Sequence, residues 1–413
     1  MNQFKFFLIK ILRWFLKKLA QLTIWRYRPG IVGITGSVGK TSAKIAIASV
    51  LSADRKVRYA KNNFNNELGL PLTILGTWEE IKGAFFWPKV FFGSVWRLIF
   101  KTDYPEILIL EYGVDRPWDM RYLLDIARPN VSVITAIGEV PAHVEFFSGP
   151  EDVAREKSKL IESLPAAGFA VLNYDDDTVM NLEERTRAHL ITFGFEKGAS
   201  VRVTGFETRS EAGRPVGVSF KLEYGGSFVP VRLDGAYGRT QGYAAAAGAC
   251  VGLIFGLNLV KISDGLRHYE PASHRLNIMP GIKNSFILDD CYNANPTSMY
   301  AALDTLRAIP AKRKIAVLGD MLEIGKYAMQ AHEKIGAIAA KVADQLVLVG
   351  PRAKFIAQGA RGDGMAKRNI QEFETAEDAK AAIREMIRSG DLILVKGSHS
   401  MQLDKVVEAI QAF

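Results

Sequence analysis

The sequence contains little cysteine, with Cys250 and Cys291 the only two among 413 residues. Two thiols cannot build the disulfide framework on which small secreted domains depend, so that class of protein is excluded. The low count fits a reducing compartment, and we predict a cytoplasmic protein. No small-residue cleavage site follows the apolar N-terminal stretch, so no secretory signal peptide is predicted.

The sequence also lacks an uninterrupted apolar run long enough to cross a membrane. Residues 4–25 are largely apolar, but charges this frequent argue against a spanning helix. With Trp14 and Trp25, the pattern is typical of a basic amphipathic helix on an anionic membrane surface. Packing against its own domain would need the same apolar stripe, and both interpretations stay open for residues 1–27. The interrupting charges are Lys5, Lys10, Arg13, Lys17 and Lys18.

A second aromatic stretch covers residues 84–100 and also carries scattered basic residues. Pro88 and Gly93 lie inside it, and we predict that they prevent one long helix. The stretch could form part of a core, or it could lie beside the N-terminal helix on a bilayer.

Acidic residues are the scarcer charged class, since 44 Asp and Glu stand against 53 Lys and Arg, a formal net charge of +9. This balance suits a phosphate-bearing substrate or an anionic membrane surface, and we predict no nucleic-acid partner. The length predicts two or three domains with sizeable cores, and we expect a monomer.

The most informative stretch is Ile31–Ser42, an apolar run followed by glycines at positions 33, 36 and 39. It predicts a buried strand, a phosphate-binding loop and a helix that begins near Lys40. Lys40 would neutralise the β- and γ-phosphates of ATP, and Thr41 would offer a hydroxyl to Mg²⁺. The first glycine lies one residue earlier than the strict spacing requires. The predicted ATP contacts here are Gly36, Ser37, Val38, Gly39, Lys40, Thr41 and Ser42.

Two further predicted strands end near residues that can do chemistry. Residues 107–110 lead to Glu111, and residues 131–134 lead toward His143. Because open parallel sheets place their sites beyond the carboxyl ends of strands, both should lie near the phosphate loop. A helix over 151–163 carries Lys157.

The rest of the chain indicates an α/β fold. Residues 190–235 alternate in short runs with glycine-rich turns, which predicts antiparallel hairpins. Strands expected at 286–289, 314–318, 345–349 and 391–395 alternate with helices at about 297–307, 327–342, 376–388 and 402–412. That spacing predicts a parallel sheet with crossover helices.

Read together, these motifs resemble those of the Mur ligases, ATP-dependent amide-bond-forming enzymes of peptidoglycan synthesis. Within the family the chain is most similar to the branch that adds D-alanyl-D-alanine to a UDP-linked tripeptide precursor. The motifs that carry the resemblance are Gly33–Ser42, Asn65–Gly69, Glu111–Gly113, Ala142–Glu145, Ala154–Lys157, Asp289–Pro296, Leu318–Glu323 and Lys396–Ser398.

The resemblance implies roles for individual residues. Thr41 and Glu111 would hold one Mg²⁺, and His143 would help to hold a second. Lys157 matches a lysine that CO₂ converts to a carbamate, an anionic ligand near the second ion. Lys40, Glu111, His143 and Lys157 would form the catalytic centre. ATP would also contact Arg275, Asp290, Asn293 and Asn295, and the other substrates Asn65, Asn66, Asp320, Lys396, Ser398 and His399.

The resemblance also implies the architecture. A central phosphate-loop domain with a small β-rich subdomain would span 28–270, and a Rossmann-like ligase domain 271–413. The family's N-terminal UDP-sugar domain has no counterpart in the roughly thirty residues before the loop, where the amphipathic segment stands instead. His274 replaces a family glycine before Arg275, and His399 replaces an arginine after Lys396–Ser398.

The expected reaction is ligation through an acyl phosphate, with ATP, two Mg²⁺ ions and a carbamylated lysine as cofactors. The substrates would be a peptidoglycan precursor and a dipeptide or amino acid, with the enzyme in the cytoplasm or peripheral on the inner face of the membrane. One alternative is a folylpolyglutamate-type or other amino-acid-adding ligase. Another is a membrane-surface nucleotide-binding module without ligase activity.

Overall fold

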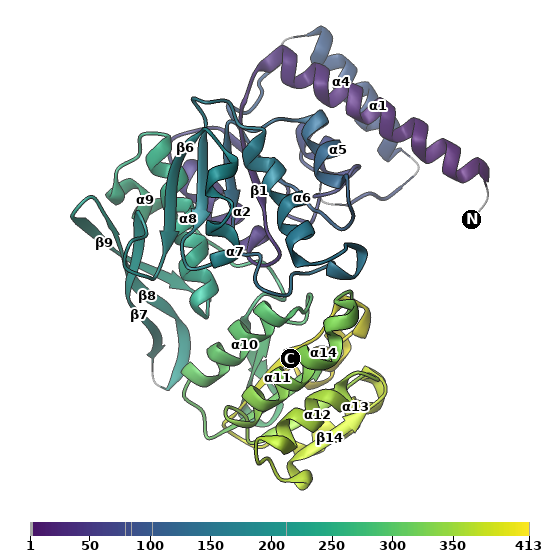
Figure 1. Cartoon of the computed structure of the whole chain (residues 1–413), viewed down its shortest axis with the longest axis vertical. Helices are drawn as coiled ribbons and strands as arrows, with labels where there is room; N and C mark the ends of the chain where they lie inside the picture. The colour runs from purple at the N-terminus through teal and green to yellow at the C-terminus, as the bar shows by residue number, and fades with distance from the viewer. Residues whose placement is uncertain (1–2, 79, 84, 101, 212, 413) are drawn as a thin grey trace.

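A computed structural model describes residues 3–78, 80–83, 85–100, 102–211 and 213–412. The chain forms two α/β domains, with the central domain in the upper part of Figure 1 and the C-terminal domain below it. The α/β class agrees with the sequence prediction. Met1 and Asn2 of the predicted N-terminal segment, Ala84 of the aromatic stretch and Phe413 lie outside the described residues.

The central domain is built on a nine-stranded sheet in the order β2-β3-β1-β4-β5-β6-β7-β8-β9. Strands β2, β3, β1, β4, β5 and β6 run parallel, so their carboxyl ends share one edge of the sheet. The strands are β1 (Gly30–Thr35), β2 (Val57–Tyr59), β3 (Ile107–Glu111), β4 (Val131–Ile134), β5 (Phe169–Asn173), β6 (His189–Gly194), β7 (Val201–Glu211), β8 (Arg214–Tyr224) and β9 (Ser227–Asp234).

Helices cover both faces of this sheet, as expected where crossovers join parallel strands. Helices α2 and α8 pack on each other and contribute small and branched side chains to the largest core. Besides α1 and α4, the helices are α2 (Lys40–Leu51), α3 (Gly69–Leu75), α5 (Asp119–Ile126), α6 (Pro150–Glu162), α7 (Asp177–Met180), α8 (Arg239–Ile254) and α9 (Leu259–Leu266), with 3₁₀ turns η1 (Val144–Phe146) and η2 (Glu183–Arg185).

Antiparallel hairpins are present as β7, β8 and β9, whereas residues 190–194, also predicted as hairpin, belong to the parallel strand β6. They extend the central sheet, because β7 pairs with β6 through a short parallel contact at Phe193–Gly194. Val203, Val218, Phe220, Val231 and Leu233 face the same core as α8. The β-rich region therefore continues the central sheet.

The C-terminal domain has a six-stranded sheet in the order β10-β11-β15-β12-β13-β14, parallel except for β10. The parallel alternation was predicted, whereas β10, β14 and α12 were not. The elements are β10 (Asn277–Gly281), β11 (Ser285–Asp289), β12 (Arg313–Gly319), β13 (Gln345–Val349), β14 (Ile370–Phe373), β15 (Asp391–Lys396), α10 (Pro296–Ala308), α11 (Ala328–Ala340), α12 (Ala353–Gly362), α13 (Ala376–Met386) and α14 (Asp404–Ile410), with 3₁₀ turns η3 (Ile282–Asn284), η4 (Gly325–Tyr327), η5 (Lys367–Asn369) and η6 (His399–Met401).

Two further helices, α1 (Gln3–Tyr27) and α4 (Phe86–Ile99), lie side by side at the end of the molecule away from the C-terminal domain (Figure 1). The prediction that Pro88 and Gly93 would prevent one helix here was wrong. Pro88 is the third residue of α4, where a backbone N–H has no partner within the helix, so its absence costs nothing. Gly93 costs about 1 kcal/mol relative to alanine, which packing of Phe86 and Val90 offsets.

Candidate active site

The phosphate loop joins β1 to α2, as the sequence predicted. Gly39 has a φ of 87°, a conformation that favours glycine, and α2 begins at the next residue. A Cβ at Gly36 would lie 2.1 Å from Thr135 Oγ1, so only glycine fits there. The N–H groups of Ser37 and Val38 donate to Ala136 O, which fixes the loop against the end of β4.

Two lysines, the half-buried Lys40 and the buried Lys157, converge on one carbonyl of this loop. Lys40 Nζ donates to Gly36 O at 2.8 Å, and Lys157 Nζ donates to the same oxygen at 3.3 Å. Burial lowers the pKa of Lys40, and its attraction to Glu111 only partly opposes that effect. Burial, reinforced by Lys40, lowers the pKa of Lys157 to about 7. Two cations that share so small a space favour an anion beside them.

The carboxylate of Glu111, the last residue of β3, lies next to the phosphate loop and contacts three polar side chains. Glu111 Oε2 lies 3.4 Å from Thr41 Oγ1 and 3.2 Å from Lys44 Nζ, and Asn65 Nδ2 donates to Glu111 Oε1 at 3.3 Å. Burial would raise the pKa of Glu111, but Lys44 and Lys40 outweigh it and the pKa is lowered. The carboxylate therefore stays ionised, as a hard ligand for Mg²⁺ must.

His143 joins the two domains. Its φ is 66°, and its Nε2 lies 3.3 Å from Asp115 Oδ1 in the central domain. Its Nδ1 lies 2.5 Å from Glu323 Oε2 in the C-terminal domain, without the alignment of a hydrogen bond. Burial lowers the pKa of His143 despite both carboxylates, so at neutral pH the ring is largely neutral and able to bind a metal.

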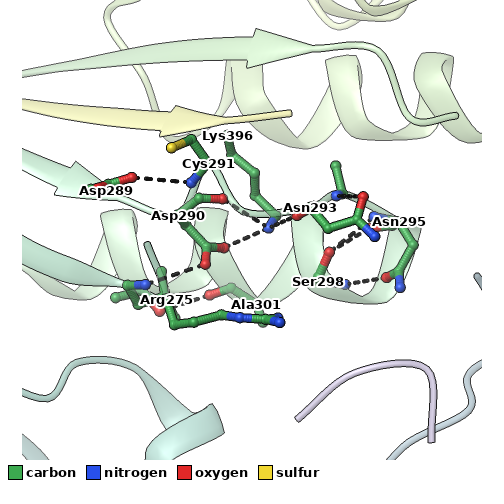
Figure 2. Close-up of polar contacts among 12 residues, drawn as sticks. Arg275, Asp289, Asp290, Cys291, Asn293, Asn295, Ser298, Ala301 and Lys396 are labelled. Carbon is green, nitrogen blue, oxygen red and sulfur yellow. Dashed lines mark hydrogen bonds and ion pairs between the residues drawn. The ribbon is translucent and has the colours of Figure 1, made fainter. Parts of the chain in front are cut away.

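The loop after β11 is held by a buried ion pair that Figure 2 shows. Lys396 Nζ at the end of β15 lies 2.5 Å from Asp290 Oδ2 and also donates to Asn293 O at 2.9 Å. Asn295 then caps α10 by exchanging hydrogen bonds with Ser298. The pair therefore shapes the loop and turns Asn293 and Asn295 toward the central domain.

Arg275 reaches the cavity from the segment between the domains. Its guanidinium lies over the Tyr292 ring, 4.2 Å from the ring centroid. The preceding His274 has a φ of 58°, and its Nδ1 lies 2.6 Å from Asp289 Oδ2. This contact fixes the turn that presents Arg275. His399 is exposed, with its ring centroid 6.0 Å from that of Tyr292.

These parts enclose a cavity of about 320 Å³ between the two domains. The phosphate loop forms one wall, and the loop after β11 forms the other. Eleven of the predicted site residues line it, and the structure thus brings together most of the predicted catalytic and ATP-binding residues. They are Ser37, Val38, Gly39, Lys40, Thr41, Asn65, Glu111, His143, Arg275, Asn293 and Asn295.

The remaining predicted residues lie behind or beside the cavity. Asn66 accepts from Leu68 N and Gly69 N at the start of α3, and Asp320 accepts from Arg352 N. Ser398 Oγ accepts from Leu322 N. Those outside the lining are Gly36, Ser42, Asn66, Lys157, Asp290, Asp320, Lys396, Ser398 and His399.

Four polar residues at the site were not predicted. Lys44 is buried against Glu111, one helical turn after Lys40, and that spacing was a readable signal. Asn63 Oδ1 lies 3.4 Å from Thr41 Oγ1, in the loop before α3. Asp115 and Glu323 face His143 from opposite domains, and Glu323 ends a motif already noted.

A second cavity of about 500 Å³ lies between the domains next to this site. Gly138 and Glu139 line it from the central domain, and Thr297 and Tyr300 from α10. The domains approach closely here, because a Cβ on Gly138 would lie 2.2 Å from Thr297 Oγ1.

Two stretches of the chain match known families. Residues 96–249 match the family described as Mur ligase middle domain. Residues 274–399 match the family described as Mur ligase, glutamate ligase domain. Together these stretches cover more than half of the chain, on both sides of the cavity.

Individual relatives agree. The UDP-N-acetylmuramoyl-tripeptide--D-alanyl-D-alanine ligase of Mycobacterium tuberculosis is 32% identical over 402 residues, which cover 92% of this chain and 73% of the relative. The ligase of the same name from Bacillus subtilis is 28% identical over 397 residues, covering 95% and 78%. MurF ligase from Thermotoga maritima in complex with ADP superposes with a TM-score of 0.79 at 27% identity, covering 96% of this chain and 83% of that structure.

Proposed function

This chain belongs to the Mur ligase family, and from that premise we propose that it is an ATP-dependent, ADP-forming peptide ligase. It joins a D-alanyl-D-alanine-like dipeptide to a peptidoglycan precursor peptide. The main support is one observation. The phosphate loop, Glu111, His143 and the loop after β11 come from two domains and line the same cavity. The relatives' names favour this reaction over the folylpolyglutamate-type alternative.

The reaction has two steps. A carboxylate of the precursor attacks the γ-phosphorus of ATP, so that an acyl phosphate forms and ADP leaves. The amine of the dipeptide then attacks the acyl carbon, which gives the amide and releases phosphate. Lys40, held at the phosphate loop, stabilises the charge that develops on the transferred group. The position of the cavity between the two domains limits the access of water to the acyl phosphate.

The donor atoms in the cavity fit magnesium. The hydroxyl of Thr41 and the ionised carboxylate of Glu111 are hard oxygen donors only 3.4 Å apart, and they would hold one ion. The neutral ring of His143 would help to hold a second. Magnesium supplies charge neutralisation of the phosphates. Lys44 then keeps Glu111 ionised and oriented.

Lys157 fits the carbamate that the family resemblance implies. Carbon dioxide reacts only with a neutral amine, and at a pKa of about 7 roughly half of the Lys157 side chains are neutral at pH 7. The product is an anion beside Lys40, which relieves the repulsion between the two neighbouring cations. The carbamate would complete the second metal site from behind the cavity.

The proposal includes the partners and the place of action. The substrates are small molecules, and we place the enzyme in the cytoplasm as a monomer. A peripheral position on the inner face of the membrane depends on α1 and α4 alone, and the catalytic centre does not require it.

The decisive experiment screens acyl substrates against dipeptide acceptors. UDP-linked, lipid-linked and free precursor peptides are each incubated with ATP, Mg²⁺ and D-alanyl-D-alanine or glutamate, and phosphate release and product mass are recorded. We expect phosphate release that depends on the dipeptide, with a product heavier by the dipeptide less one water. ATP turnover with glutamate only would favour the folylpolyglutamate-type alternative. ATP binding without acceptor-dependent phosphate release would favour the nucleotide-binding module.

Replacing His399 with arginine should lower the apparent KM for D-alanyl-D-alanine at pH 7.5 or above. Arginine is a permanent, bidentate partner for a carboxylate, whereas histidine carries its charge mainly below neutral pH. The position is suitable because His399 is exposed beside Tyr292, which lines the cavity. Kinetics with the dipeptide and its amide test this, with Lys367→Arg as a surface control. An equal KM for both acceptors in both proteins would remove residue 399 from the acceptor site.

A further inference from the structure

Helix α1 carries apolar side chains on its solvent side as well as on its buried side. Along this side, apolar residues recur at helical spacing on one face, interrupted by the exposed Lys18 between Phe15 and Leu22. The exposed fractions of Phe7 and Trp25 reach 58% and 70%. This exposed stripe consists of Phe7, Leu8, Ile11, Trp14, Phe15, Leu22 and Trp25.

Helix α4 carries a second stripe of the same kind. Phe92 at 73% and Ile99 at 64% exposed are among its most accessible side chains. The two helices are in contact, and the rings of Phe15 and Phe91 meet edge to face along that line. The exposed stripe of α4 and its flanks consists of Phe85, Phe92, Val95, Trp96, Ile99 and Phe100.

The opposite face of α1 is fixed on the domain, which holds the first stripe outward. Leu16, Ala20 and Thr23 are buried, and Leu16 joins a core with Leu72 and Leu75 of α3. Arg13 pairs with Glu67, and Lys17 pairs with Asp125 on the same side. The helix therefore cannot turn its aromatic residues inward without breaking these contacts.

We propose that α1 and α4 form a docking surface for an anionic lipid bilayer, here called the α1–α4 surface. Exposed apolar patches of this extent mark interaction sites. No acidic residue occurs in residues 1–30 or 81–101, whereas basic residues border both stripes. Exposed examples are Lys10, Lys18, Arg26 and Lys89.

The positive charge of the α1–α4 surface favours an anionic bilayer over other binding partners. Anionic lipid headgroups attract juxtaposed lysine and arginine, while tryptophan and phenylalanine enter the boundary between headgroups and acyl chains. A second copy of the chain would bring two purely basic surfaces together, so self-association here is disfavoured. Among the described residues no helix is long and apolar enough to cross a membrane. The bilayer is therefore bound from its surface.

The surface also lies where a membrane can reach it without obstructing catalysis. Figure 1 shows α1 and α4 at the far end of the central domain from the C-terminal domain. The catalytic cavity lies between the two domains. A docked enzyme would therefore hold that cavity away from the bilayer and accessible to water-borne ATP.

The test is co-sedimentation of the full chain with vesicles, without ATP or substrate, so its result is independent of the ligase assignment. Vesicles of phosphatidylcholine alone are compared with vesicles containing phosphatidylglycerol, at low and high NaCl. We expect binding to the anionic vesicles that weakens as salt screens the charges. If the protein stays in the supernatant when anionic vesicles are sedimented at low salt, the proposal is wrong.

Point variants show which residues bind. The variant Phe7→Ser/Trp25→Ser/Phe92→Ser removes exposed aromatic rings and leaves the core intact, so it should fold and lose about tenfold or more in vesicle affinity. Phe228→Ser, at an equally exposed site on β9, is the matched control and should bind like the wild type. Equal binding by the triple variant would contradict the proposal. A second contradicting outcome would be self-association. Sedimentation velocity would then show a wild-type dimer and a monomeric triple variant, and neither protein would bind vesicles.

Discussion

Replacing Lys40 with alanine should reduce kcat by on the order of 10²–10³-fold, the loss typical for one preorganised group that stabilises transition-state charge. Lys40 is fixed at Gly36 O, so its ammonium is in place before ATP arrives. Added Mg²⁺ should not restore the rate, because the ion occupies a different position from the ammonium. Phosphate release at saturating ATP measures the effect, with Lys56→Ala on the exposed surface as the control.

Glu111→Ala should also lose turnover, but its rate should recover partly as the Mg²⁺ concentration rises. The variant lacks a metal ligand, and mass action can compensate for weaker binding. Removing the carboxylate also leaves Lys44 buried without its ion pair, so thermal unfolding must be recorded beside the kinetics. Glu106→Gln, at the exposed end before β3, is the control. If Lys40→Ala and Glu111→Ala respond equally to Mg²⁺, the assigned roles are wrong.

Lys157→Ala should lose activity by on the order of 10²-fold, as is common when a group that supports a metal site is removed. Short carboxylic acids such as acetate should restore part of the rate by replacing the carbamate anion.

The pH dependence of wild-type activity has a definite sign. The pKa of Lys157 is lowered to about 7, so the reactive neutral amine is lost as pH falls through 7. In CO₂-limited buffer, wild-type activity should therefore rise between pH 6 and 8.

Two controls separate a carbamate from a structural lysine. Lys159→Ala lies on the same helix but pairs with Glu156, and it should keep its activity. Wild-type protein incubated with ¹³C-bicarbonate should show a carbamate signal in ¹³C NMR that Lys157→Ala lacks. Full activity of the alanine variant in CO₂-depleted buffer would exclude the modification.

The parts of the site that could be predicted from sequence are those that local chemistry determines. Gly36 and Gly39 are required by backbone conformation within one turn, so the loop is readable from consecutive residues. The pairing of Asp290 with Lys396 was not predictable from spacing, because the two residues are 106 positions apart and meet only across adjacent strands. Both were expected to contact ligands, and the structure uses them to shape a loop; their ligand contacts stay predictions.

For the N-terminal segment, the sequence predicted a helix but not the surroundings of its two faces. Its periodicity offered two interpretations, a helix on the domain or a helix on a membrane. Helix α1 has two apolar faces, one packed through Leu16 and Ala20 and one exposed through Phe7 and Trp25. A periodic pattern reports that a face is apolar, but not what covers it, so sequence alone could not assign the two sides.

The second cavity between the domains makes the enzyme vulnerable at a place outside the cavity that the phosphate loop lines. Gly138 and Thr297 approach so closely there that even a methyl group would act as a spacer. A molecule too large for the cavity of about 500 Å³ between Glu139 and Tyr300 would hold the two domains apart and draw Glu323 away from His143. Such an inhibitor would lower the maximal rate by disturbing the arrangement of the domains, without occupying the phosphate loop.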